Sequence, residues 1–164
     1  MSCFELAPEV MTESSPTLQS PALPATRCGE LSLSALRGKP VVVYFYPRDN
    51  TPGCTRQGEG FRDHYGAFRE HECEIVGVSR DSLASHEKFA AKFKFPFPLI
   101  ADADEVLCRH FDVIKEKNMY GRKVMGVERS TFLFDADGQL VREWRKVKVP
   151  GHVEEVLAAL AELN

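Results

Sequence analysis

The chain has 164 residues, of which 43% are hydrophobic and 27% are charged, and its formal net charge is −3 at pH 7. This length suits one globular domain with a sizeable core, and the small negative charge leaves no basic surplus for binding nucleic acid or an acidic membrane surface. No apolar run approaches the roughly 20 residues that a membrane-spanning helix needs.

The first 17 residues are polar, contain proline and follow the period of neither a helix nor a strand. We therefore expect a mobile leader over residues 1–17, followed by a single domain over residues 18–164. Glu5 and Glu9 lie where a secretory signal would carry a basic segment and then an apolar one, which argues against export. Met11 is a second candidate for the first residue.

The cysteines and histidines follow no metal-binding pattern. The five cysteines are Cys3, Cys28, Cys54, Cys73 and Cys108. Their spacing matches neither a disulfide framework nor a zinc site, and the five histidines likewise lack the spacing of metal ligands. We expect no metal and no cofactor, and this use of cysteine predicts a reducing compartment, the cytoplasm.

The core begins with a turn and a short strand over residues 25–33, which predict an N-terminal β-hairpin. Residues 41–46 form an unbroken run of valine, tyrosine and phenylalanine, typical of a central strand that is covered on both faces. Phe61, Tyr65 and Phe68 then recur at helical spacing. This spacing predicts an amphipathic helix whose first turn lies at or near Cys54 and which includes these three aromatic residues.

Cys54 follows a turn that is made rigid by Pro47, Pro52 and Gly53. A helix N-terminus presents free N–H groups and partial positive charge, which favour a thiolate over a thiol. The Thr51 hydroxyl is placed to reach toward the sulfur or an incoming oxygen. A small cysteine that only packs in the core is the plain alternative, but the composition of the turn favours a reactive one.

The rest of the chain alternates between strand and helix patterns. The predicted elements are a strand over 74–79, a helix over 83–93 capped by Asp81 or Ser82, a short strand over 97–100, a helix near 106–111 capped by Asp102 or Asp104, a charged loop over 114–126 at a pocket mouth, a hairpin over 131–144 and a closing helix over 153–160. Pro98 predicts an edge or strand-start position. This order predicts an α/β fold with a mixed sheet flanked by helices.

The order Pro47, Thr51 and Cys54 after this strand resembles the active-site motif of the peroxiredoxins, which are thiol peroxidases of thioredoxin-like fold. The surrounding residues, from Tyr46 to Thr55, resemble the Q-type subfamily, also called bacterioferritin comigratory proteins. Further segments keep the order of this subfamily, at residues 77–81, 111–113, 128–133 and 144–147. The resemblance spans roughly residues 18–160 and implies a thioredoxin-like fold and an antioxidant enzyme.

In the reaction that the resemblance implies, the Cys54 thiolate attacks hydrogen peroxide or an organic hydroperoxide and becomes a sulfenic acid, which thioredoxin or another thiol reduces. The resemblance also assigns Arg129 to the site as a cation beside the thiolate, and Pro47 as a shield from water. The backbone N–H groups of Gly53 and Cys54 are available to the departing oxygen. Whether Gln57 joins this network or lies on the helix surface stays open. We expect a monomer or a weak homodimer.

Two other classes of function stay open. A thioredoxin-like thiol-disulfide oxidoreductase needs Cys-x-x-Cys, but the second position here is Gln57. A redox-inert binding module would keep the fold without turnover, and loss of hydrogen peroxide in the presence of a thiol separates it from an enzyme.

The chain departs from the subfamily at the resolving cysteine, because Glu59 and Ala90 occupy its two usual positions. We therefore expect a one-cysteine peroxidase or one that uses an outside thiol. Cys73 is predicted at the far end of the strand layer from Cys54, whereas Cys108 is harder to exclude. Gly58 and Gly60 each cost about 1 kcal/mol relative to alanine in a helix interior, so the opening turns of the Cys54 helix are expected to unwind readily.

Overall fold

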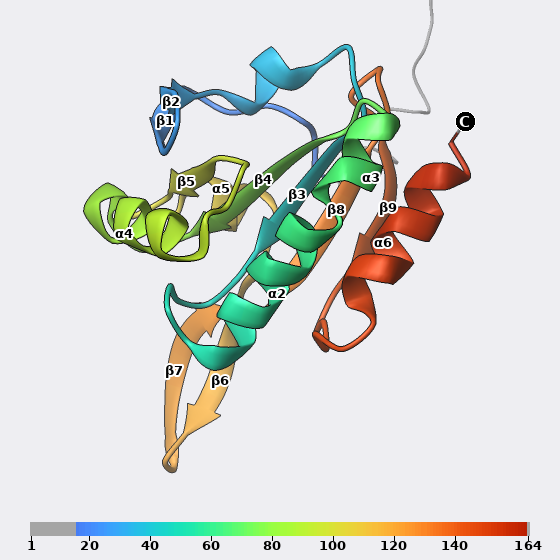
Figure 1. Ribbon diagram of the computed structural model, residues 1–164. Helices are drawn as coiled ribbons and strands as arrows, with labels where there is room; N and C mark the ends of the chain where they lie inside the picture. The colour runs from blue at the N-terminus through green and yellow to red at the C-terminus, as the bar shows by residue number, and fades with distance from the viewer. Residues whose placement is uncertain (1–15, 164) are drawn as a thin grey trace, which may run out of the picture.

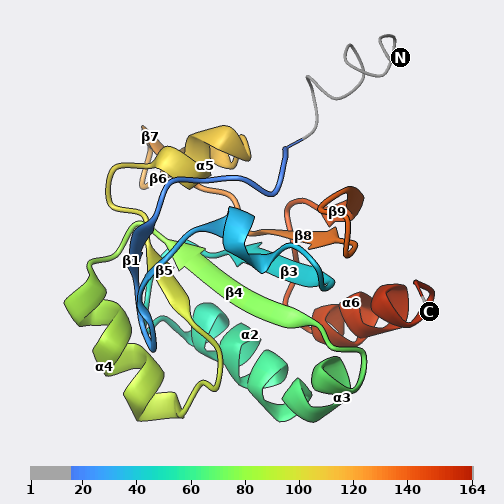
Figure 2. The same cartoon turned by 90° about the horizontal axis from the view of Figure 1, so that it is seen from above.

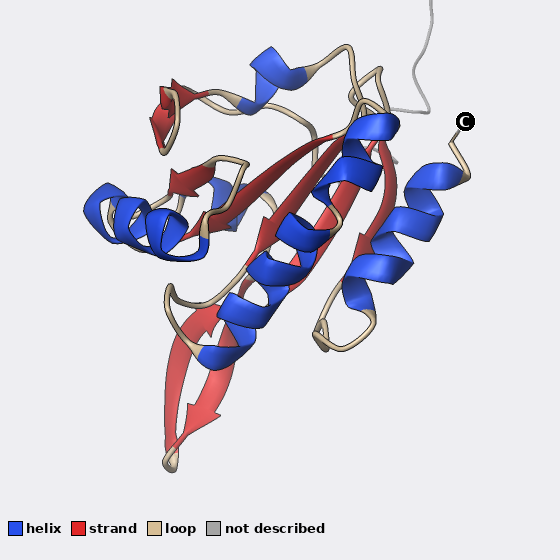
Figure 3. Ribbon diagram, viewed as in Figure 1, coloured by secondary structure: helices blue, strands red, loops and turns tan. Residues whose placement is uncertain are grey.

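The computed structural model describes residues 16–163, so the predicted mobile leader lies almost wholly outside the described residues and stays a prediction. Within this range the chain forms a seven-stranded sheet with helices on both faces, and a separate two-stranded hairpin projects from one end (Figures 1 and 3). No helix among these residues is both long and apolar enough to cross a membrane.

The strands of the large sheet stand in the order β2-β1-β5-β4-β3-β8-β9. They are β1 (Leu23–Ala25), β2 (Gly29–Leu31), β3 (Val41–Phe45), β4 (Glu74–Ser79), β5 (Leu99–Ala101), β8 (Ser130–Phe134) and β9 (Leu140–Trp144). The β3–β4 and β4–β5 pairs are parallel and the other pairs are antiparallel, so the sheet is mixed as predicted. The hairpin consists of β6 (Ile114–Met119) and β7 (Arg122–Val127).

Helices cover both faces of the sheet (Figure 2). One face carries α2 (Pro52–Asp63), α3 (Tyr65–Glu70), α4 (Leu83–Phe93) and α6 (His152–Ala161), and the other carries the 3₁₀ helix η1 (Leu33–Leu36) and α5 (Val106–His110). Alternate residues of β3 enter the two cores: Val42 and Tyr44 pack under α2, and Val43 and Phe45 pack under α5. Burial on both faces explains why this strand is apolar throughout.

The register of β3 positions the site. Phe45, the last residue of β3, pairs with Val78 of parallel β4 and with Ser130, the first residue of antiparallel β8. The turn that follows β3 therefore lies beside the residue that precedes β8, which is Arg129. Cys54 and Arg129 are 75 positions apart in the sequence, but they meet because β8 runs antiparallel to β3 and begins where β3 ends.

Most predicted elements are confirmed: the N-terminal hairpin, the strand over 74–79, the helix over 83–93, the closing hairpin and the final helix. The Ser82 side chain caps α4 by accepting the Ser85 N–H. Asp102 caps α5 from a distance, since its carboxylate accepts the N–H groups of Leu107 and Cys108.

Two expectations were wrong, for residues 114–126 and for the helix after Cys54. Residues 114–126 form most of the β6–β7 hairpin rather than a loop, because Tyr120 and Gly121 both adopt positive φ, at 55° and 80°, as a tight hairpin turn requires. Pro98 marks the start of a strand, one of its two predicted positions: it immediately precedes β5, which lies between β1 and β4. The helix after Cys54 is also interrupted, with α2 ending at Asp63 and α3 beginning at Tyr65.

Candidate active site

Cys54 is the third residue of α2, and its side chain is only 2% exposed. Thr51 precedes the helix with an extended backbone, φ −96° and ψ 156°, and Pro52 occupies the first helical position, where its missing N–H costs nothing. The N–H groups of the first helical turn have no partner within the helix. The predicted placement of Cys54 at a helix start is therefore confirmed.

Arg129 contacts Cys54 directly. Its Nη2 donates to Cys54 Sγ at 3.4 Å, and its Nη1 donates to Gln57 Oε1 at 2.6 Å. Gly53 makes this approach possible, because a Cβ at that position would lie 3.1 Å from Nη2. One guanidinium thus spans the first turn of α2 from Gly53 to Gln57.

Gln57 belongs to the network rather than to the helix surface. Its side chain is fully buried, and its Oε1 accepts from Arg129. Its Nε2 is buried with no hydrogen-bond partner among the described residues. Buried amide donors are usually paired, so this unpaired donor beside Arg129 is unusual. The helical spacing of Gln57 from Cys54 was the sequence signal, but burial was needed to choose between the two interpretations.

Thr51 and Pro47 belong to the turn between β3 and α2. The Thr51 hydroxyl donates to the Arg48 carbonyl at 2.9 Å, which closes the turn on itself instead of reaching the sulfur. Its oxygen keeps lone pairs that can accept a further hydrogen bond. Pro47 is half-buried beside it. Both residues line a cavity, of about 380 Å³, between the turn and the β6–β7 hairpin.

The hairpin contributes the other wall of this cavity, through Val124, Met125 and Val127 together with Lys117. Burial lowers the pKa of Lys117, and the nearby Arg129 and Arg80 lower it further. The prediction that residues 114–126 lie at a pocket mouth is thus confirmed although they are strands. Lys117 itself was missed, because nothing local in the sequence distinguishes it from its charged neighbours.

Tyr44 lies beneath the site in the β3 layer and stacks on Phe61 of α2, with ring centroids 4.7 Å apart. Burial raises the pKa of the Tyr44 hydroxyl, and the negative charge of a Cys54 thiolate adds to this rise. The Tyr44 side chain therefore stays protonated and uncharged near neutral pH, and it packs beneath the site without accepting a proton.

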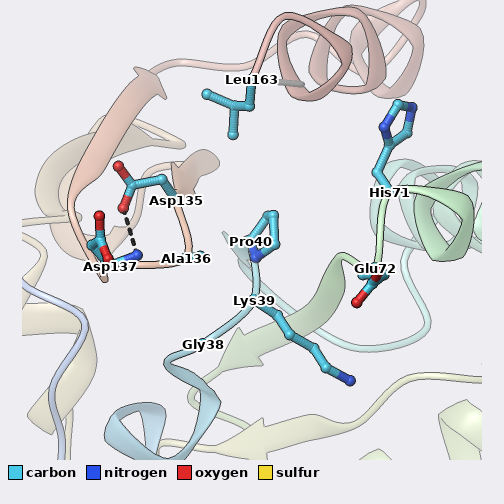
Figure 4. A pocket seen from close by; sticks show the side chains of 9 residues that line it. All are labelled: Gly38, Lys39, Pro40, His71, Glu72, Asp135, Ala136, Asp137 and Leu163. Atoms are coloured by element: carbon cyan, nitrogen blue, oxygen red, sulfur yellow. Dashed lines mark hydrogen bonds between the residues drawn. The ribbon is translucent and has the colours of Figure 1, made fainter.

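A second cavity, of about 430 Å³, lies at the opposite end of β3 (Figure 4). Lys39 and Pro40 line it before β3 begins, and Asp135 and Asp137 line it from the turn between β8 and β9. None of the cysteines that the structure describes lines this cavity, and Cys54 follows the other end of β3. This cavity is therefore separate from the site around Cys54.

The other described cysteines do not approach Cys54. Cys73 precedes β4, whose start pairs with the start of β3, so five strand residues, roughly 16 Å, separate it from the turn that leads to Cys54. Cys108 packs in the core on the other face of the sheet. Burial raises the pKa of Cys73 to about 12, and burial with the Asp102 carboxylate raises that of Cys108 further. Cys28 is an exposed free thiol in the β1–β2 turn.

The two positions where the subfamily carries a resolving cysteine are both on the Cys54 side of the sheet. Ala90, on α4, packs against the core cluster that contains Cys54, and Glu59 is half-buried on α2. Neither side chain can form a disulfide. Of the four described cysteines, Cys73 and Cys108 are buried with raised pKa values, Cys28 is exposed, and Cys54 is bonded by Arg129.

Comparison with known proteins gives consistent matches. The model of the AhpC/TSA family matches residues 15–143. Peroxiredoxin Bcp of Xanthomonas campestris pv. campestris is 56% identical over 131 residues, which cover 80% of this chain and 82% of that protein. Peroxiredoxin Bcp of Bacillus subtilis is 48% identical, with 82% and 85% covered. A structure of Xanthomonas campestris peroxiredoxin Q with a Cys-to-Ser substitution superimposes with a TM-score of 0.85 at 51% identity, covering 90% of this chain and 94% of that one.

Proposed function

Since the chain belongs to the AhpC/TSA family as a Q-type peroxiredoxin, and is thus a thiol-dependent peroxidase, we propose that Cys54 is the residue that reacts with the hydroperoxide. The observation that carries this assignment is the Arg129 guanidinium, which bonds both Cys54 Sγ and Gln57 Oε1. A permanent cation at 3.4 Å from the sulfur stabilises the negative charge of a thiolate.

In the first step the Cys54 thiolate attacks the distal oxygen of the hydroperoxide. The S–O bond forms as the O–O bond breaks, the sulfur is oxidised to a sulfenic acid, and the departing oxygen takes a proton to leave as water or an alcohol. Arg129 and the free N–H groups at the start of α2 stabilise the charge on that oxygen. Thr51 and Pro47 line the cavity where the hydroperoxide lies.

We propose that the substrates include organic hydroperoxides as well as hydrogen peroxide. The cavity beside the turn has an apolar wall of Val124, Met125 and Val127, which an alkyl group can contact. A structure of the Xanthomonas campestris bacterioferritin comigratory protein in trapped intermediate and ligand complexes concerns its alkyl peroxide reduction activity. That chain is 51% identical to this one.

Since neither Cys73 nor Cys108 approaches Cys54, we propose that the second step uses a thiol from outside the chain. The thiol attacks the Cys54 sulfenic acid, a mixed disulfide forms as water leaves, and a second thiolate releases Cys54. We propose thioredoxin as this reductant and the cytoplasm as the location. The cysteines among the described residues are all free thiols, which supports a reducing compartment.

Replacement of the sulfur tests the proposal. The Cys54→Ser variant is expected to fold normally and to lose peroxide turnover, because a serine hydroxyl stays protonated near pH 7. Consumption of hydrogen peroxide and of an organic hydroperoxide is followed with thioredoxin and its reductase present. Cys28→Ser serves as the matched control and keeps full activity. Retained turnover in Cys54→Ser would refute the assignment.

A further inference from the structure

Asp49 lies within the active-site turn, yet its side chain contacts α4 rather than the reacting sulfur. Its carboxylate is 6% exposed. The Tyr46 hydroxyl donates to Oδ1 at 2.7 Å, and the Ser85 hydroxyl donates to Oδ2 at 2.8 Å. His86 Nδ1 lies 2.7 Å from the same Oδ2. Tyr46, which follows β3, and Ser85 and His86 of α4 therefore all contact the Asp49 carboxylate.

The partners of His86 fix its protonation. The ring is fully buried, with Nε2 2.9 Å from the Ile100 carbonyl oxygen. A carbonyl oxygen only accepts, so Nε2 carries a hydrogen. The Asp49 carboxylate accepts from the Tyr46 and Ser85 hydroxyls, and a hydrogen on Nδ1 lets it accept from His86 as well. From this geometry we infer that both nitrogens donate and that His86 is an imidazolium paired with the Asp49 carboxylate.

The neighbouring groups agree with this assignment. Burial, and next the Asp49 carboxylate, raise the pKa of the Tyr46 hydroxyl, which keeps it a neutral donor. Asp81 is the other acidic group near the pair, and its Oδ2 accepts from the Asp49 N–H at 2.9 Å and from the Ser79 hydroxyl at 2.5 Å. The ligand atoms of Asp49, Asp81 and His86 lie within 4.8 Å of one another, as in a metal site, but protein donors already occupy them.

We propose that the buried Asp49–His86 ion pair is a positioning device that fastens the active-site turn to α4 and so holds Cys54 in its reactive geometry. Asp49 stands between Pro47 and Thr51, and the hydrogen bonds from Tyr46 to Asp49 and from Thr51 to the Arg48 carbonyl close the turn on itself without reaching α4. Without the ion pair, the side-chain hydrogen bond that still joins the turn to α4 is the one from the neutral Ser85 hydroxyl to residue 49. The proposal rests on the assignment of Cys54 as the reacting residue.

The protonation is tested first, by ¹⁵N NMR of the histidine rings in the reduced wild-type protein. Both His86 nitrogens are expected to carry hydrogens near pH 7. In Asp49→Asn, which keeps the size of the side chain, the amide can donate to Nδ1, so His86 is expected to become neutral with a hydrogen on Nε2 alone. An unprotonated Nδ1 in the wild-type protein would overturn the ion pair, whether or not any variant folds.

The positioning role is tested by the rate at which one equivalent of hydrogen peroxide oxidises Cys54. Since a displacement of about 1 Å can cost roughly 100-fold in rate, we expect Asp49→Asn to slow this step at least about tenfold, and Ser85→Ala to slow it less. Asp102→Asn is the matched control: it removes a buried carboxylate that caps α5 and lies outside the turn, so it lowers stability without slowing oxidation.

An unchanged rate in Asp49→Asn, or an equal loss of rate in Asp102→Asn, would overturn the positioning role. These outcomes differ from failure of the proposed function itself. If Cys54 is not the reacting residue, the wild-type protein shows no oxidation at Cys54 at all, whereas the NMR signals of His86 stay as described.

Discussion

At the scale of the residue, the site consists of the Cys54 sulfur and the Arg129 guanidinium, which the buried Gln57 amide holds in place by a hydrogen bond. The turn chemistry around Cys54 could be predicted from the sequence, because prolines and glycine at fixed offsets act locally. Arg129 could be assigned only by resemblance, since its contact with Cys54 depends on strand pairing 75 positions away. The burial of Gln57 and the partners of Asp49 could not be predicted, because each depends on packing between elements.

Replacing Arg129 tests whether its positive charge or its planar guanidinium group assists the oxidation of Cys54. We expect Arg129→Ala to slow the oxidation of Cys54 by about 100-fold, as loss of a fixed donor at a developing charge does in other enzymes. Arg129→Lys should recover part of the rate, because an ammonium supplies charge but cannot bond Cys54 and Gln57 with one planar group. Rapid-mixing experiments with stoichiometric peroxide measure this rate.

The matched control for this experiment is Arg142→Ala. Arg142 is an exposed cation that lies over the Trp144 ring at 5.0 Å, outside the site. We expect no change of rate. If Arg129→Ala oxidises as fast as Arg142→Ala, the guanidinium does not assist the reaction.

At the scale of the element, the glycines of α2 are explained by close packing. A Cβ on Gly58 would lie 2.4 Å from the Phe95 ring, and one on Gly60 would lie 2.9 Å from Val153. The sequence predicted these glycines as weak points of the helix, and that consequence remains a prediction. Their close contacts could not be foreseen, because Phe95 and Val153 come from other parts of the chain. The β6–β7 hairpin was missed for a different reason, since its strands carry little of the apolar alternation that marks a buried face.

The glycine contacts can be tested with a pair of alanine substitutions. In Gly58→Ala, overpacking against Phe95 costs about 1–3 kcal/mol, which exceeds the gain of about 1 kcal/mol in helix propensity, so stability falls. In Gly66→Ala on α3, where nothing lies within 4 Å of the new Cβ, stability rises by about 0.4–1 kcal/mol. Urea unfolding gives both values. Equal stabilisation by the two substitutions would show that packing does not require Gly58.

At the scale of the whole molecule, the sheet determines which thiols can meet. Cys108 lies in the core on the far face, Cys73 lies at the far end of β3, and Ala90 stands where a resolving cysteine is usual. The order of strands and helices could be predicted from the sequence, and with it the separation of Cys73 from Cys54. The separation of Cys108 required the crossing of α5 to the other face, which no local pattern specifies.

The most direct measurement is to map the product of a single oxidation. The reduced protein receives one equivalent of hydroperoxide in the presence of dimedone, which labels sulfenic acids, and its peptides are analysed by mass spectrometry. We predict that Cys54 alone carries the label and that no disulfide joins it to another cysteine of the same chain. A label on Cys73 or Cys108, or a rapid and stoichiometric disulfide within the chain, would contradict the account.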